Sequence, residues 1–180
     1  SILVEIPIGF LLVVARYAPY ALDRVSTALA LPGVMTTGST KGTHIFWLDI
    51  SGSTAGSIMR NQMDILRKAV ASSSASRKII IPFGSDYGEN MVARYHSIGL
   101  FWWNANEFLR CFALNPPPSS GGTSLYYARR HAEQFLPDMI ASTVITDGHL
   151  GTPLPNALTH FPSAGFRLHV VGSMDDSILR

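Results

Sequence analysis

The chain of 180 residues has few charged side chains. Only 14% of its residues are Asp, Glu, Lys or Arg, whereas about 25% is usual in soluble domains. The formal net charge of +2 provides none of the clustered basic charge that nucleic-acid binding requires, so we expect no nucleic-acid partner. Nineteen Ser and eleven Thr partly replace the missing charge. A surface this poor in charge suggests a protein that works in contact with partners.

Cysteine and long apolar runs are also scarce. The single cysteine, Cys111, excludes an internal disulfide and cysteine-based zinc sites, and it fits a reducing compartment. The most apolar stretch, residues 6–22, is interrupted by Pro7, Arg16 and Pro19, and its uncharged part is far shorter than the ~20 residues of a spanning helix. No basic segment precedes it, as a signal peptide would require. We therefore expect a cytoplasmic protein with no membrane partner.

The apolar residues that are present predict one domain with an N-terminal extension. Hydrophobic residues make up 47% of the chain, which is ample for a sizeable core. Residues 1–35 are expected to form a strand and a helix that pack on a sheet, with the first few residues as candidates for pairing at its edge. Residues 36–43, rich in Gly, Ser and Thr, are expected to be a linker. The main domain is then residues 44–180.

Apolar runs alternate with amphipathic segments throughout this domain. The runs are apolar on both faces, which is typical of parallel strands that helices cover on both sides. The sequence therefore predicts an α/β fold with a doubly wound, Rossmann-like, mostly parallel sheet flanked by helices. In such sheets, ligands bind beyond the carboxyl ends of the strands, where the strand order reverses. The predicted strands are residues 44–50, 78–83, 91–98, 142–147 and 166–172, and the predicted helices are residues 57–70, 104–114 and 124–136.

Oxygen-bearing side chains gather where three of these elements meet loops. Asp49-Ile50-Ser51-Gly52-Ser53 leaves the first strand of the domain, Gly121-Gly122-Thr123 precedes a helix, and Thr146-Asp147-Gly148 leaves a later strand. Carboxylates and hydroxyls are hard ligands, and Mg²⁺ needs few carboxylates because it usually keeps several waters. Soft metals would require Cys or clustered His, and the six histidines show no ligand spacing.

The three segments resemble the metal-ion-dependent adhesion site (MIDAS) of von Willebrand factor A (vWA) domains, and residues 44–173 resemble such a domain. The motif is Asp-x-Ser-x-Ser, a later Thr, and an Asp in a Ser/Thr-Asp-Gly turn. Here it is filled by Asp49, Ser51, Ser53, Thr123 and Asp147. The resemblance implies a bound Mg²⁺ (or Mn²⁺) that recognises a Glu or Asp carboxylate of a protein partner. Some intracellular members work with AAA+ ATPases, so such an ATPase or a larger assembly is the partner that the resemblance implies.

The chain departs from the family pattern after the last predicted strand. Family members usually continue with a helix and a sixth strand, which residues 173–180 are too few to supply. Either the sheet is one strand short, or the N-terminal extension supplies the missing edge. Met usually follows the second motif serine, whereas Thr54 stands there in this chain.

Simpler explanations exist for four of the five motif residues. Asp49, Ser51 and Thr123 could cap helices, and Asp147-Gly148 could form an ordinary turn. Each of these explains one residue rather than five that converge. The rival function is a Mg²⁺-dependent phosphoester hydrolase using Asp49 or Asp147, but no general acid or basic phosphate clamp accompanies them. A third possibility is a metal that only stabilises the fold. We expect a binding module rather than an enzyme.

Aromatic and apolar residues near the motif are candidate anchors for the partner. We expect Tyr87, His149 and Leu150 to surround the metal site, because buried aromatic and apolar anchors supply most of the affinity of protein interfaces. The cluster at residues 101–103, Phe-Trp-Trp, is expected to belong to the core instead.

Overall fold

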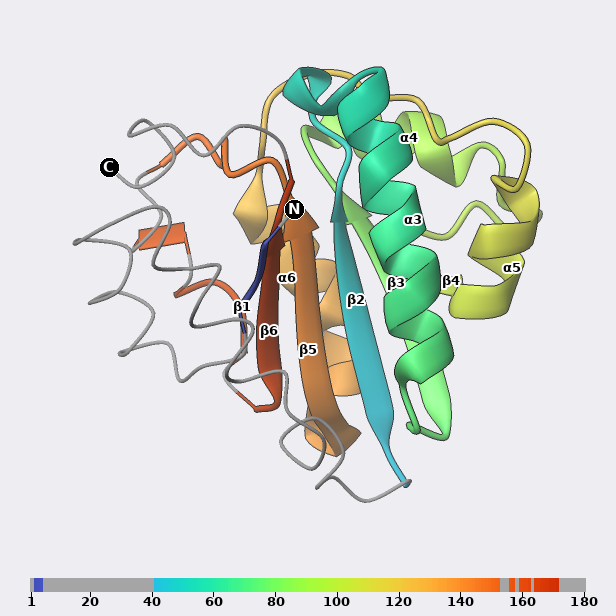
Figure 1. Cartoon of the computed structure of the whole chain (residues 1–180), viewed down its shortest axis with the longest axis vertical. Helices are drawn as coiled ribbons and strands as arrows, with labels where there is room; N and C mark the ends of the chain where they lie inside the picture. The colour runs from blue at the N-terminus through green and yellow to red at the C-terminus, as the bar shows by residue number, and fades with distance from the viewer. Residues whose placement is uncertain (1, 5–40, 153–155, 158, 163, 172–180) are drawn as a thin grey trace.

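The computed structural model describes residues 2–4, 41–152, 156–157, 159–162 and 164–171, which form a six-stranded sheet flanked by helices (Figure 1). The strands are β1 (Ile2–Val4), β2 (Thr43–Asp49), β3 (Arg77–Phe83), β4 (Trp103–Asn104), β5 (Met139–Thr146) and β6 (Phe166–Val170). The helices are α3 (Ser57–Ser72), α4 (Asp86–Ala93), α5 (Ala105–Cys111) and α6 (Leu125–Ala132), with the 3-10 helices η1 (Gly52–Thr54) and η2 (Glu133–Asp138). In this part of the chain no helix combines the length and the apolar character needed to cross a membrane.

The strand order is β1-β6-β5-β2-β3-β4. The four central strands are mutually parallel, and the short edge strands β1 and β4 are antiparallel to their neighbours. After β2 the chain proceeds to β3 and β4 on one side, and then returns to β5 and β6 on the other. The order therefore reverses between β2 and β5, as in a Rossmann-like sheet. The predicted mostly parallel α/β sheet with flanking helices is confirmed.

The N-terminal residues 2–4 lie at the far edge of this sheet. Ile2, Leu3 and Val4 pair with Val170, His169 and Leu168 of β6 in antiparallel register. This agrees with the expectation that the first residues pair at an edge. The helix predicted within residues 1–35 and most of the predicted linker lie outside the described residues. Thr43, the last linker residue, is the first residue of β2.

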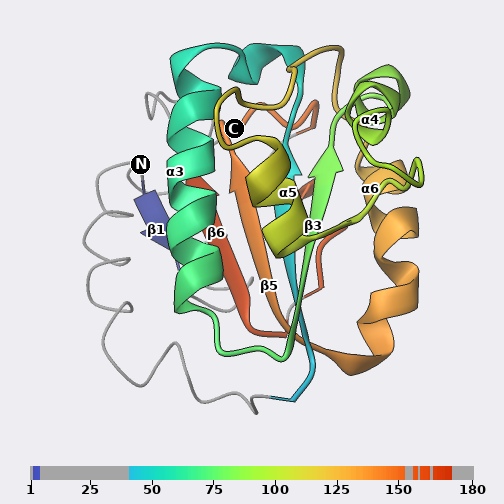
Figure 2. The ribbon, with the colours of Figure 1, turned by 90° about the vertical axis from the view of Figure 1, so that its right-hand side faces the viewer.

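Two apolar clusters fill the two faces of the sheet. Along β2, Ile45 and Trp47 belong to one cluster, and Phe46 and Leu48 to the other, because successive side chains of a strand point to opposite faces. Residues of α6 complete the first cluster, and residues of α3 and α5 complete the second. Figure 2 shows α3 and α6 on opposite sides of the sheet. All seven residues of β2 are buried, which explains the uninterrupted apolar run from Ile45 to Leu48.

One predicted strand is wrong. Residues 91–98 do not form an edge strand, because residues 86–93 form α4 and the chain continues in turns. Ser85 begins this helix by accepting a hydrogen bond at Oγ from the backbone N–H of Gly88, and Asp86 places a carboxylate in the first turn, which favours a helix N-terminus. The edge strand is instead β4, with only two residues.

The remaining elements agree with the sequence prediction apart from their ends. Asn104 caps α5 through its Oδ1, which accepts hydrogen bonds from the backbone of residues 106 and 107. The predicted helix 124–136 is shorter, because the α-helix ends at Ala132 and a 3-10 helix containing Pro137 continues to residue 138. Trp103 is buried, as expected, whereas Phe101 and Trp102 are only partly buried.

Candidate metal centre

The carboxyl ends of β2, β3 and β5 meet at one edge of the sheet, at the top of Figure 1. Asp49 is the last residue of β2, and Asp147 follows the last residue of β5. These two strands are neighbours at the point where the strand order reverses. The two carboxylates of the motif therefore flank the position where α/β sheets of this kind bind ligands.

Asp49 is fully buried, and both of its carboxylate oxygens accept hydrogen bonds. Oδ1 accepts from the backbone N–H of Ser51 at 2.9 Å and from Ser51 Oγ at 2.6 Å. Oδ2 accepts from Thr146 Oγ1 at 2.6 Å. Burial raises the pKa of Asp49 to about 6, and the charge of Asp147 adds to the rise, whereas the hydrogen bonds from Ser51 and Thr146 oppose it. The carboxylate is thus held rigidly in a place where its charge is costly.

The second carboxylate, Asp147, is only 2% exposed, and only one of its two oxygens accepts a hydrogen bond. Its Oδ1 accepts a hydrogen bond from the backbone N–H of His149 at 3.0 Å, which forms the expected turn around Gly148. Its Oδ2 is buried and has no hydrogen-bond partner. A buried polar oxygen without a partner is uncommon and calls for an explanation.

The serines of the motif lie beside Asp49. Ser51 Oγ and Ser53 Oγ are 3.2 Å apart. Because Ser51 donates its own proton to Asp49, Ser53 is the donor of this second bond. Ser53 is exposed, so the hydroxyl chain runs from the buried carboxylate to the surface. Capping does not explain Asp49 or Ser51, since Ser51 forms no side-chain cap to η1 and the residue that precedes α3 is Gly56.

Thr123 lies in the loop that precedes α6, and its Oγ1 donates to the carbonyl oxygen of His149 at 3.4 Å. This contact places Thr123 against the turn that contains Asp147. Helix capping does not account for Thr123 either, because the N-cap of α6 is Ser124 and it forms no side-chain cap. The structure therefore joins Asp49, Ser51 and Ser53 directly, and it places Thr123 and Asp147 on adjoining turns.

Backbone hydrogen bonds fasten these loops together. The N–H of Gly52 donates to the carbonyl of Gly121 at 2.9 Å, and the N–H of Ser120 donates to the carbonyl of Ile50 at 3.0 Å. The side-chain hydroxyls of Thr54 and Ser119 are 2.9 Å apart. The loop of Thr123 is thereby held against the loop of Ser51 and Ser53 over several residues.

The sequence patterns do not single out Thr146 and Gln62, which both donate hydrogen bonds to Asp49. Thr146 was noted only as part of a turn, but its hydroxyl is the sole partner of Asp49 Oδ2 among the hydrogen bonds of the described chain. Gln62 on α3 donates from Nε2 to the backbone carbonyl of Asp49 at 2.8 Å. A fully buried Gln on the otherwise apolar face of a helix is the signal that could have indicated this role.

The donor set fits a hard divalent cation. In the described part of the chain no ion pair joins Asp49 or Asp147 to a basic residue. Buried carboxylates are costly unless a cation or a metal balances them. No group of three or more His, Cys, Asp or Glu side chains suited to a metal occurs among these residues, so any ion here would rely on hydroxyls and water as well as on the two carboxylates. Mg²⁺ accepts such a shell.

Two of the three expected anchors around this site are exposed, and the third is buried. Tyr87, in the first turn of α4, has 62% of its surface exposed, and His149 is also exposed. Leu150 was wrongly expected at the surface. It is 2% exposed and packs in the cluster with Leu125 and Phe161, because the turn after Asp147 directs the chain back into the core.

Comparison of the chain with protein-family models, with curated proteins and with solved structures gave no match. The interpretation of the site therefore depends on its own geometry.

Proposed function

We propose that this protein is a vWA-type binding module that holds Mg²⁺ or Mn²⁺ at the carboxyl edge of its sheet and uses the ion to bind an acidic side chain of a partner protein. The observation that supports this most strongly is the unpartnered Oδ2 of Asp147, buried next to the charge of Asp49. A cation at this place would balance both carboxylates and give that oxygen a partner.

The five motif residues would have different roles in holding the ion. Ser51, Ser53 and Thr123 would offer neutral hydroxyl oxygens, and Asp147 would offer its free Oδ2, directly or through a water. Asp49 already uses both oxygens, so its role is to hold Ser51 Oγ in place and to add negative charge. A bound Mg²⁺ supplies charge and an octahedral direction for an incoming carboxylate. We extend the proposal to a Glu or Asp of an AAA+ ATPase or of another subunit in a cytoplasmic assembly.

Calorimetry of the full chain with MgCl₂ and MnCl₂ tests the metal site. We expect saturable binding that Asp147→Asn and Ser53→Ala weaken or abolish, and that Asp138→Asn, at the opposite edge, leaves unchanged. Absence of binding, or equal binding by all variants, would refute the proposal.

Partner binding is tested by affinity purification in Mg²⁺ and in EDTA. We expect Ser53→Ala and Thr123→Ala to lose the same partner that EDTA releases, while the circular dichroism spectrum stays native, because Ser53 in η1 is exposed and Thr123 in the loop before α6 is only partly buried. Turnover of p-nitrophenyl phosphate that depends on Mg²⁺ and on Asp49 would instead favour the hydrolase.

A further inference from the structure

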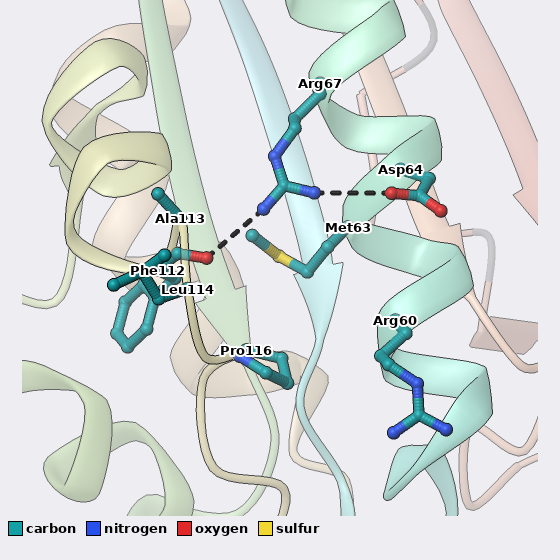
Figure 3. A pocket seen from close by; sticks show the side chains of 8 residues that line it. All are labelled: Arg60, Met63, Asp64, Arg67, Phe112, Ala113, Leu114 and Pro116. Carbon is teal, nitrogen blue, oxygen red and sulfur yellow. Dashed lines mark hydrogen bonds and ion pairs between the residues drawn. The ribbon is translucent and has the colours of Figure 1, made fainter.

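A groove lies between α3 and the segment that follows α5. Its lining includes no residue of the three segments that carry Asp49 to Ser53, Gly121 to Thr123 and Asp147, which we call the metal loops. It has a cavity of about 220 Å³ and is lined by α3 between Arg60 and Arg67 and by the chain from Phe112 to Pro116 (Figure 3). An apolar cavity of ~150 Å³ takes benzene, whereas drug-sized ligands need about 300 Å³ or more. The groove therefore has room for a single large side chain.

Two apolar side chains of the core lie at the base of the groove. Met63 and Phe112 are 2% and 3% exposed and belong to the core cluster between α3 and the sheet. Leu114 stands at the rim with 94% of its surface exposed, and Pro116 is exposed next to it. A single exposed leucine is ordinary, but one beside a cavity of this size can close over an inserted side chain.

The two arginines of the groove differ in their hydrogen-bond partners. Arg67 donates from Nη1 to Asp64 Oδ1 at 3.3 Å and from Nη2 to the carbonyl of Phe112 at 3.2 Å, as the dashed lines of Figure 3 show. These two bonds hold its guanidinium in place. Arg60 is exposed, and no described residue forms a hydrogen bond or an ion pair with its guanidinium. The groove thus has at one end a positive charge with no partner among the described residues, and beside it a cavity lined by both polar and apolar atoms.

We propose that this groove binds a segment of a partner protein that carries a large apolar side chain next to a carboxylate. The apolar side chain enters the cavity over Met63 and beneath Leu114, and the carboxylate pairs with Arg60. One free cation is too few for a nucleic acid, which would need a row of them. The site uses none of the five metal-site residues, so it is a second recognition site that does not require the ion.

The position of the groove allows one partner to use both sites. Arg60 lies in the first turn of α3, and Pro116 precedes Ser119, whose hydroxyl contacts Thr54 directly behind the metal loops. The span from Arg60 to Arg67 covers about 10 Å along the helix axis. An extended segment of a few residues could follow that length.

The test is a titration of the ¹⁵N-labelled full chain, in EDTA, with the blocked peptide Gly-Asp-Phe-Asp-Gly at millimolar concentration, followed by amide chemical shifts. We expect saturable shifts confined to the amides of residues 60–67 and 112–115. A peptide with Asn in place of both Asp, and one with Gly in place of Phe, should each shift these amides much less.

Two variants with matched controls complete the test. Arg60→Glu should weaken binding about fivefold or more, whereas Arg94→Glu, an exposed arginine at the end of α4, should not. Leu114→Ser should weaken it, whereas Ile98→Ser, also exposed, should not. Absence of saturable shifts, equal binding of all three peptides, the same shifts with inorganic phosphate, or self-association through these amides would overturn the proposal. Because EDTA is present throughout, failure here leaves the metal site unaffected.

Discussion

The carboxylates at the amino edge and at the carboxyl edge of the sheet, where the parallel strands begin and end, have different surroundings. At the amino edge, Asp138 accepts hydrogen bonds at both oxygens from Arg77 Nη2, at 3.2 and 3.1 Å, and Thr43 Oγ1 donates to it at 3.0 Å. Both members of this ion pair are about half exposed. At the carboxyl edge, Asp49 and Asp147 are buried, and no described basic residue pairs with either.

This difference separates a carboxylate whose charge is balanced by a described residue from two whose charges are not. Water and a guanidinium balance the charge of Asp138, so it needs nothing further. The charges of Asp49 and Asp147 at the carboxyl edge are buried close to each other. This is unfavourable unless something outside the described chain balances them. The contrast leads to four predictions.

The first prediction concerns the stabilisation by Mg²⁺. At a hundredfold excess over the dissociation constant a ligand contributes about 2.7 kcal/mol, which for a chain of this size raises the Tm by roughly 5–10 °C. Asp147→Asn should abolish this shift, and Asp138→Asn should retain it, as differential scanning fluorimetry would show. If both variants retain the shift, the ion binds elsewhere.

The second prediction concerns a backbone change in the metal loops. Gly121 has φ +72°, and a Cβ at this position would collide with the side chain of Ser85. We expect Gly121→Ala to lower the free energy of unfolding by about 1–3 kcal/mol and to weaken Mg²⁺ binding, because the Gly121 carbonyl holds Gly52. Gly122→Ala, where a Cβ meets no atom within 4 Å, is the control and should change stability by less than about 0.5 kcal/mol. Equal effects in urea unfolding would contradict this account.

The third prediction concerns the loss of stability in acid, to which His44 at the amino end of β2 contributes. Burial lowers the pKa of His44 from 6.5 to about 3, and the charges of Arg167 and Lys78 contribute. Its ring nitrogens lie 2.7 Å from the hydroxyls of Ser73 and Thr143, so the neutral ring is well accommodated.

The unfolded chain protonates His44 below pH 6.5, while the folded chain does not until about pH 3. This contribution to stability is therefore complete above pH 6.5 and is lost as the pH falls toward 3, by at most about 1.4 kcal/mol per pH unit. Urea unfolding from pH 7 to pH 4 should show a shallower loss for His44→Gln than for the wild type. The exposed His160→Gln should follow the wild type, and identical slopes for all three would refute the assignment.

The smallest effect should come from the ion pair at the amino edge. Exposed pairs contribute about 0.2–1 kcal/mol and are screened by salt, so Asp138→Asn should destabilise by no more than this, and less in high salt. Arg77→Ala is a poorer test, because the guanidinium also lies over Phe135, 5.1 Å from the ring centroid. A loss of several kcal/mol for Asp138→Asn would show that the amino edge is as constrained as the carboxyl edge.

Patterns that lie within one element predicted most of the fold. The strand at residues 43–49 is apolar on both faces, and α3 repeats buried Met59, Met63, Leu66 and Val70 on one side, so each is visible in the sequence. Residues 91–98 misled the prediction, because buried Val92 and Ala93 suit a strand as well as a helix, and the deciding feature is the Ser85 cap. A two-residue strand such as β4 has no periodicity to detect.

The sequence by itself determined which residues could form a metal site, since carboxylates and hydroxyls at the ends of adjacent parallel strands must come close together. Only the tertiary structure decided how they differ. Packing between distant segments pairs both oxygens of Asp49, leaves Oδ2 of Asp147 without a partner, and draws Leu150 into the core. It also brings Arg60 and Leu114 to one groove. Hydrogen bonding and burial depend on contacts between residues far apart in the chain, which no local pattern records.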